Sequence, residues 1–141
     1  MAIAHISAGD WETLGAAASE IRRRVFIEEQ NVPQEEEWDG LDSECQHFLA
    51  MLDDQPVGTA RLLPDAHIGR VAVLKEARGT GIGVLLMRAA IEAARHAGHP
   101  EVTLSAQVHA LAFYEQLGFV AHGEEFMDAG IPHREMTLSL D

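Results

Sequence analysis

Arg78-Gly79-Thr80-Gly81-Ile82-Gly83 is the stretch that decides the fold. It lies between residues 67–74, an apolar run typical of a strand, and residues 82–97, where apolar side chains recur at helical spacing. Glycines at alternate positions let the backbone turn sharply and allow successive N–H groups to point at one anion. The helix that follows adds the partial positive charge of its N-terminus. The stretch therefore predicts a phosphate-binding loop.

Two better-known glycine loops are excluded by the residues that follow. A P-loop needs Lys and then Ser or Thr directly after its last glycine, and Val84 and Leu85 stand there instead. A dinucleotide-binding loop that began at Gly79 would need Gly or Ala at position 84 and an acid at the end of the next strand. Glu101 stands at the start of that strand. A purely structural turn stays open as an alternative.

Length and composition predict one domain over residues 1–141, with a core that needs neither disulfides nor metal. The single cysteine, Cys45, excludes an intramolecular disulfide and favours a reduced, cytoplasmic setting. No stretch is apolar for long enough to cross a membrane. The eight histidines show no spacing typical of a metal site, so no metal is expected.

The charge pattern separates two regions of the chain. A net charge of -13 argues against nucleic acid or an anionic membrane as a partner. Half of the ten basic residues surround the glycine loop: Arg61, Arg70, Lys75, Arg78 and Arg88. No basic residue lies between Arg24 and Arg61, where the acids are Glu28, Glu29, Glu35, Glu36, Glu37, Asp39, Asp42, Glu44, Asp53 and Asp54. We expect the acidic region to attract a cationic substrate, although a merely solvated loop is the alternative.

Apolar periodicity and turn residues predict ten elements along the chain. Strands are expected at residues 2–7, 46–52, 57–63, 67–74, 102–104, 119–127 and 135–140. Helices are expected at 11–26, which Asp10 caps, at 82–97 and at 110–117, and residues 34–45 are expected to form an acidic loop. This order predicts a mixed α/β sheet with an antiparallel meander before the glycine loop and helices on its faces.

These features together resemble the GNAT superfamily of N-acetyltransferases over nearly the whole chain. Arg78, Gly81 and Gly83 match its motif [Q/R]-x-x-G-x-[G/A], and residues 113–119 follow the fifth strand as in that family. Residues 24–33, 36–39 and 130–133 look like those of the ElaA/YjcF subgroup. The resemblance implies a single-domain α/β fold of about seven strands, with a parallel splayed pair beside the meander.

The resemblance also implies acetyl-CoA as co-substrate. Backbone N–H groups of residues 79–84 would hold the pyrophosphate, with Arg78 as a charge partner. Strand backbone at residues 71–73 would pair with the pantetheine arm, and an N–H there, expected to be that of Val73, would polarise the thioester carbonyl. Gln107 would bind the arm or the acceptor. The expected cofactor-binding residues are Val71, Ala72, Val73, Arg78, Gly79, Thr80, Gly81, Ile82, Gly83, Gln107 and Tyr114.

Three residues are expected to carry the chemistry. Tyr114, the only tyrosine, lies on the helix where the family often places the general acid that protonates the leaving thiolate. Packing in the core is its alternative role. Glu29 and His133 are the preferred bases among Glu28, Glu29, His109 and His133, each of which could instead have a plain surface or hydrogen-bonding role.

The predicted function is therefore transfer of an acetyl group from acetyl-CoA to a primary amine by direct attack in a ternary complex. We expect the acceptor to be a small molecule or peptide, with a cationic one favoured by the acidic region. A noncatalytic acyl-CoA sensor or assembly subunit on the same fold is the alternative. A homodimer is possible, because members of the family are often dimers.

Overall fold

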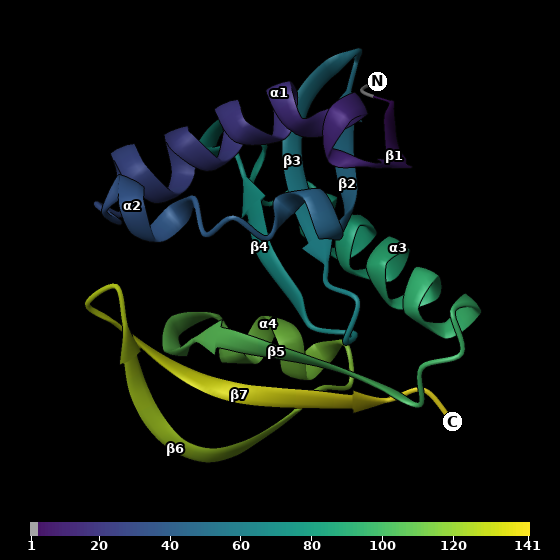
Figure 1. The fold of residues 1–141 in the computed structure, drawn as a ribbon, viewed down its shortest axis with the longest axis vertical. Helices are drawn as coiled ribbons and strands as arrows, with labels where there is room; N and C mark the ends of the chain where they lie inside the picture. Colours follow the sequence, from purple (N-terminus) through teal and green to yellow (C-terminus); the bar gives the residue numbers. More distant parts are fainter. Residues whose placement is uncertain (1–2) are drawn as a thin grey trace.

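The computed structural model describes residues 3–141, whose strands form two antiparallel sheets (Figure 1). The first sheet has the order β1 (Ala4–Gly9), β2 (Gln46–Leu52), β3 (Gln55–Leu62) and β4 (Ile68–Val73). The second has the order β5 (Glu101–Gln107), β7 (Ile131–Ser139) and β6 (Val120–Asp128). The α-helices are α1 (Trp11–Arg22), α2 (Gln34–Glu37), α3 (Ile82–His96) and α4 (Leu111–Gln116).

The first sheet lies between two helices because its strands are apolar on both faces. Phe48 and Ala50 of β2 belong to one buried cluster with Leu86 and Ala90 of α3. Leu49, which points to the opposite face, belongs to a second cluster with Ile21 near the end of α1. The expected meander with helices on both faces is therefore confirmed. No helix within residues 3–141 is long and apolar enough to span a membrane.

The two sheets meet at a single parallel bridge between His67 and Thr103. The Thr103 N–H donates to the carbonyl of Ala66 at 3.1 Å, and beyond this point β4 and β5 diverge (Figure 1). The parallel splayed pair is thus confirmed. The expected strands are arranged as two antiparallel sheets, and β5 has β7 as its hydrogen-bonding neighbour along its whole length.

Several element bounds differ from the sequence prediction. The expected α-helix over residues 11–26 changes at Arg23 into a π-helix, η1 (Arg23–Glu29), in which the Gln30 N–H reaches the carbonyl of Val25. The predicted acidic loop contains α2 and a 3-10 turn, η2 (Asp42–Glu44). Two further 3-10 turns are η3 (Lys75–Ala77) and η4 (Val108–Ala110). The predicted start of the first strand at Ala2 lies outside the described residues.

The last strand begins four residues earlier than predicted. Ala129 and Gly130 have φ values of 52° and 76°, the left-handed pair that closes a two-residue hairpin. Ile131 therefore pairs with Asp128, and Pro132 lies within the strand opposite Met127. The predicted strand excluded Pro132, and proline is rare within strands. The longer β7 carries His133 into the sheet.

Candidate active site

Backbone groups of β4 face the gap between the two sheets without a strand partner. The Leu74 N–H donates to the carbonyl of Val57 at 2.8 Å, so Leu74 faces β3. Alternate residues of a strand direct their backbone groups to opposite edges, so Val73 and Val71 face away from β3. The carbonyl of Val73 accordingly accepts a hydrogen bond from Nε of Arg78 at 2.9 Å. The N–H groups of Val71 and Val73 open into the gap.

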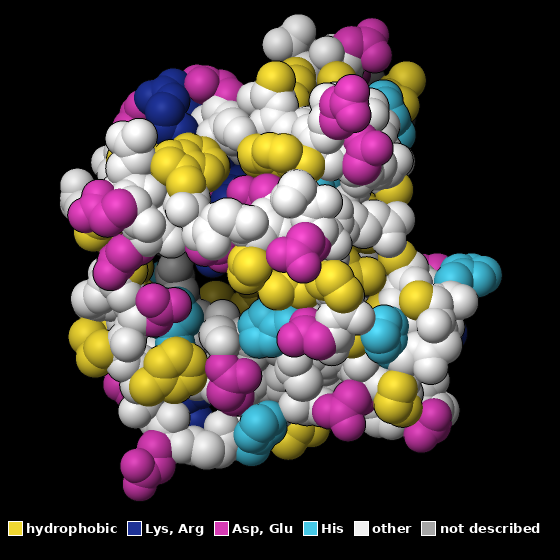
Figure 2. All heavy atoms as spheres, viewed as in Figure 1, with side chains coloured by type: hydrophobic (Ala, Val, Ile, Leu, Met, Phe, Trp, Pro, Cys, Tyr) yellow, Lys and Arg dark blue, Asp and Glu magenta, His cyan; other side chains and the backbone are white. Residues whose placement is uncertain are grey.

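The opposite side of the gap is built in the same way by β5. Thr103 directs its N–H toward β4, so Ser105 and Gln107, two and four residues further on, face the same side. The gap is a cleft with a volume of about 600 Å³, lined by residues of both strands. Figure 2 shows the molecule hollowed between the part that carries α2 and the part that carries β7. An extended ligand could therefore pair with both strands.

The glycine loop leads from β4 into the N-terminus of α3. Gly79 and Gly81 have φ values of +78° and +84°, and an added Cβ at either would meet no atom within 4 Å. Gly81 is the N-cap of α3 and supplies no side-chain cap. The first N–H groups of this 15-residue helix therefore have no capping side chain and can bind an anion. Gly83 has another role, because its Cβ would lie 3.2 Å from the ring of Phe113 on α4.

Arg78 is engaged by the protein itself. Its Nη1 and Nη2 each lie 2.7 Å from a carboxylate oxygen of Glu29 on η1. The hydrogen bonds from Arg78 lower the pKa of Glu29, and those to Glu29 raise the pKa of Arg78. The two predicted site residues thus neutralise one another at the edge of the cleft. The backbone N–H groups of the loop are therefore the main groups here that could bind an anion.

Tyr114 lines the cleft together with Val71 and Val73. It comes from α4 and packs edge-on against Phe113 and Phe119, with ring centroids 5.0 and 6.1 Å apart. Burial raises the pKa of Tyr114 to about 12. The hydroxyl therefore stays protonated at neutral pH and can donate a hydrogen bond.

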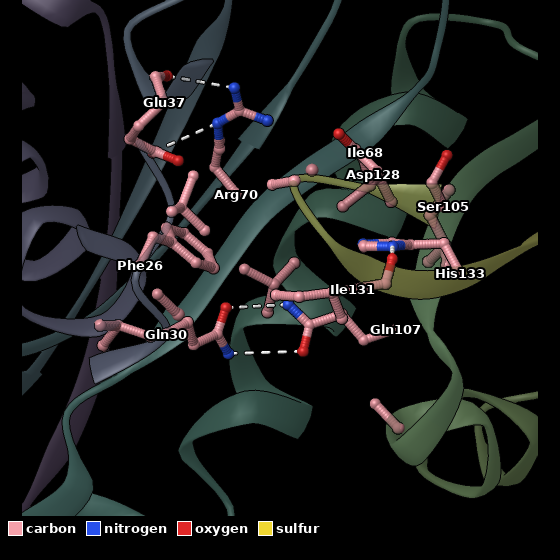
Figure 3. A pocket seen from close by; sticks show the side chains of 18 of the residues that line it. Phe26, Gln30, Glu37, Ile68, Arg70, Ser105, Gln107, Asp128, Ile131 and His133 are labelled. Carbon is pink, nitrogen blue, oxygen red and sulfur yellow. Dashed lines mark hydrogen bonds and ion pairs between the residues drawn. The ribbon is translucent and has the colours of Figure 1, made fainter. Parts of the chain in front are cut away.

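His133 lies opposite Gln107 in the register of β7 and β5. Its Nδ1 lies 2.7 Å from the carbonyl of Ile131. Since a carbonyl only accepts, Nδ1 carries the hydrogen, and a neutral ring then has a free electron pair on Nε2. The residue is 8% exposed, and its ring stacks on that of Phe126 with the ring centroids 5.8 Å apart. Figure 3 shows it on the β7 side of the pocket, across from Arg70. Nε2 is therefore available as a base.

Gln107 is joined to Gln30 by two reciprocal amide hydrogen bonds of 2.9 and 3.4 Å (Figure 3). Gln30 directly follows the π-helix, so this pair connects the N-terminal half of the molecule to β5 across the cleft. Gln30 was not among the residues predicted from the sequence. A π-helix beside a cleft is a common feature of functional sites, but its wider turn leaves no clear periodicity signal.

A buried ion network forms one wall of the site, and sequence analysis missed it. Three arginines and three acids take part: Arg22, Arg61, Arg70, Glu37, Asp39 and Asp42. The Arg22 guanidinium lies between the rings of Trp11 and Trp38, at 5.5 and 5.1 Å from their centroids. The acidic stretch is thus partly buried and neutralised, not wholly a solvated loop. The available signal was Arg61 inside an apolar strand, since a charge there needs partners.

Two carboxylates of the cleft lining keep their charge unmatched. Glu36 from α2 and Asp128 from the end of β6 both line the cleft and form no ion pair within residues 3–141. The described residues include no group of three or more His, Cys, Asp or Glu side chains arranged to hold a metal ion. Unmatched acids at this position favour a positively charged ligand.

Comparisons with known proteins agree with this geometry. Residues 13–140 match the model of the acetyltransferase (GNAT) domain. The chain is 41% identical over 120 residues to the uncharacterized N-acetyltransferase YjcF of Bacillus subtilis. The alignment covers 82% of this chain and 86% of that protein. It is 35% identical over 129 residues to the protein ElaA of Escherichia coli, with 86% and 84% covered.

Solved structures give the same result. A crystal structure of an acyl-CoA N-acyltransferase from Pseudomonas aeruginosa superimposes with a TM-score of 0.86 at 34% identity, covering 97% of this chain and 100% of that one. A putative streptothricin acetyltransferase from Bacillus anthracis, solved with acetyl coenzyme A, has a TM-score of 0.61 at 25% identity, with 70% and 64% covered. With its splayed strands, glycine loop and matched family model, the chain belongs to the GNAT family of N-acetyltransferases.

Proposed function

We propose that this protein transfers an acetyl group from acetyl-CoA to a primary amine by direct attack within a ternary complex. The observation that carries the proposal is the cleft between β4 and β5, where backbone groups of the two strands face one another without pairing strand to strand. The glycine loop and the N-terminus of α3 follow β4 in the chain. A ligand with an extended arm and a phosphate group would satisfy both sets of groups.

The residues of the cleft have complementary roles in this proposal. Acetyl-CoA, when bound, supplies an acetyl thioester. The N–H of Val73 donates a hydrogen bond to the carbonyl oxygen that gains charge during attack. Nε2 of His133 takes a proton from the attacking amine, and the hydroxyl of Tyr114 gives its proton to the departing sulfur. The N–H groups of residues 79–84 hold the phosphates, while Glu29 keeps Arg78 folded against β4.

Two sequence-predicted bases differ in what they offer. Glu29 accepts two hydrogen bonds from Arg78, and these lower its pKa, which makes the carboxylate a weak proton acceptor. The Nδ1–H of His133 donates to the carbonyl of Ile131, which leaves the electron pair on Nε2 free to accept a proton. We therefore assign proton abstraction to His133 and a structural role to Glu29.

The acceptor is proposed to carry a positive charge besides the amine that reacts. Glu36 and Asp128 would attract such a group to the mouth of the cleft. The reacting amine must lose its proton before attack and then no longer attracts the acids. A second cationic group keeps its charge and can bind them while the neutral amine reacts. Diamines, polyamines and lysine-containing peptides have this chemistry.

The test is to mix the purified protein with acetyl-CoA and a panel of amines and to follow the release of free thiol. Turnover is expected with at least one polyamine or basic peptide, and no turnover with any amine in the panel would contradict the proposal. Coenzyme A binding without turnover would instead support the alternative of a noncatalytic acyl-CoA sensor. Isothermal titration with coenzyme A alone measures that binding.

A further inference from the structure

The strand that borders the cofactor cleft contains an irregularity at an unusual residue. In the β3–β4 ladder Thr59 pairs with Ala72 and Arg61 pairs with Gly69. Arg70 and Val71 therefore face the single residue Ala60, which is the pattern of a β-bulge. Arg70 has φ 50°, a left-handed conformation that non-glycine residues rarely adopt. The neighbouring Gly69 does not take that conformation, so the strained position is occupied by an arginine.

The side chain of Arg70 is held at several points. Its Nη2 donates to the carbonyls of Glu36 and Glu37 at 3.3 and 3.1 Å and lies 3.2 Å from Oδ2 of Asp39. Its Nε lies 3.2 Å from Oε2 of Glu37. Figure 3 shows the guanidinium of Arg70 beside Glu37, at the wall of the pocket. Backbone strain of this kind persists only where the surroundings enforce it, and these contacts come from one segment, residues 36–39.

Glu37 connects that segment to the rest of the molecule. Its side chain is 4% exposed, and its Oε2 also accepts from Nε of Arg22 at 2.7 Å. Arg22 is buried between two tryptophan rings and also binds Asp42. The charges therefore form a continuous chain from α1 through α2 to the bulge. Buried ion pairs contribute little net stability because their desolvation is costly, so stability alone does not account for this arrangement.

The bulge of Arg70 and Val71 contains one of the two N–H groups that face the cleft and lies two residues before the other, that of Val73. Inserting one residue into β4 resets the direction of everything that follows it, including Val71 and Val73. We infer that Arg70 and Glu37 are positioning residues: their ion pair holds the left-handed bulge and so orients the β4 backbone that binds the acyl donor. The catalytic part of this inference rests on the proposed acetyl transfer, whereas the mechanical part does not.

The experiment compares three variants without any cofactor and then with it. Arg70→Gly removes the side chain while permitting φ 50°, and Glu37→Gln removes the charge while keeping the shape. Glu35→Gln is the matched control, since Glu35 lies on the same helix, is exposed, and neither contacts Arg70 nor lines the cleft. The first readout is the heteronuclear ¹⁵N NOE of the cofactor-free proteins, which reports fast backbone motion. It should fall at residues 70–73 in the first two variants and stay unchanged in the control.

The second readout separates positioning from general damage. For Arg70→Gly and Glu37→Gln, kcat should fall by about 10²-fold, because small misplacements at a reacting centre have effects of that size. Affinity for coenzyme A should fall by less than kcat does, since the phosphate loop is unaltered. A rigid β4 in both variants would overturn the inference, and so would an unchanged kcat in an active enzyme. If the wild type acetylates no amine, the proposed function fails. The NOE then still tests whether the ion pair of Arg70 and Glu37 holds the bulge. If Arg70→Gly does not fold, Glu37→Gln decides.

Discussion

Arg78 and Glu29 form a two-point ion pair, with both terminal nitrogens of the arginine 2.7 Å from carboxylate oxygens, across 49 positions of the chain. The pair fastens the π-helix η1 to the segment that joins β4 to the glycine loop. Nε of the same arginine donates to the carbonyl of Val73, so one side chain joins η1 to β4 at the edge of the cleft. Two residues expected to act separately, on phosphate and on a proton, are bound to each other.

This pairing leads to a prediction that distinguishes the two possible bases. Glu29→Gln should leave kcat within about 3-fold of wild type, because in this account Glu29 does not accept the proton. Removing the residue that does would lower kcat far more. Coenzyme A affinity should rise, since the Arg78 guanidinium is released next to the phosphate loop. Steady-state kinetics and titration with coenzyme A measure both. A loss of kcat of about 10²-fold or more would make Glu29 the base.

His133→Gln should lower kcat by about 10² to 10⁴-fold, because the amide cannot accept a proton from the attacking amine. His122→Gln is the control, as His122 lies on the exposed side of β6 and contacts Thr137. Equal activity of the His133 variant and the control would remove His133 from the chemistry.

Tyr114→Phe should reduce kcat by about 10²-fold while coenzyme A binds as before, because only the proton donor is removed. The edge-on contacts with Phe113 and Phe119 involve the ring and should survive, so the melting temperature should hardly change. An unchanged rate would mean that Tyr114, whose pKa is about 12, gives no proton and serves only in packing. Another group would then protonate the sulfur.

Gly81→Glu should abolish coenzyme A binding through its bulk and its charge at the N-terminus of α3. Gly98→Glu is a close control, because Gly98 has φ +86° beside the opposite end of the same helix and an equally open surrounding. Both variants bear similar backbone strain, yet only the first should lose affinity in isothermal titration. Retained affinity in Gly81→Glu would place the phosphates elsewhere.

The ion network predicts how stability depends on pH. The hydrogen bond from Arg61 holds the pKa of Asp39 far below its usual range in the folded protein. At a pH between the pKa of Asp39 in the folded protein and its pKa of about 3.9 in the unfolded chain, the unfolded chain binds more protons. The free energy of unfolding therefore falls as the pH drops. Chemical denaturation at about pH 6 and about pH 3 should show this loss. Asp39→Asn should lose less stability over this pH range than the wild type. The exposed control Glu35→Gln should lose as much as the wild type. The same pH dependence in Asp39→Asn and the wild type would contradict the assignment.

Local sequence patterns predicted the parts of the site that are made of backbone. Glycines at positions 79 and 81 need no partner from elsewhere in the chain to adopt positive φ values. The helical spacing from Ile82 onward likewise located α3 to within a residue. The splay of β4 from β5 followed from the resemblance to the family, and the bridge at His67 and Thr103 confirms it.

What sequence analysis missed depends on contacts between distant residues. Glu37 and Asp42 were interpreted as members of a charged stretch, and nothing near them in sequence shows that Arg22 and Arg61 lie within 3.0 Å. The left-handed conformation of Arg70 was equally hidden, because arginine has no preference for it and Gly69 stands beside it. Such features arise from tertiary packing, which a local pattern does not record.

Amide hydrogen exchange at residues 71–73, measured with and without coenzyme A, tests the central claim most directly. The N–H groups of Val71 and Val73 face the open cleft, whereas Ala72 between them pairs with Thr59 of β3. If the cofactor arm adds to β4 as a strand, exchange at Val71 or Val73 should slow by about 10-fold or more, while exchange at Ala72 stays the same. Unchanged exchange at both valines, with coenzyme A bound, would show that the cleft between β4 and β5 is not the cofactor site.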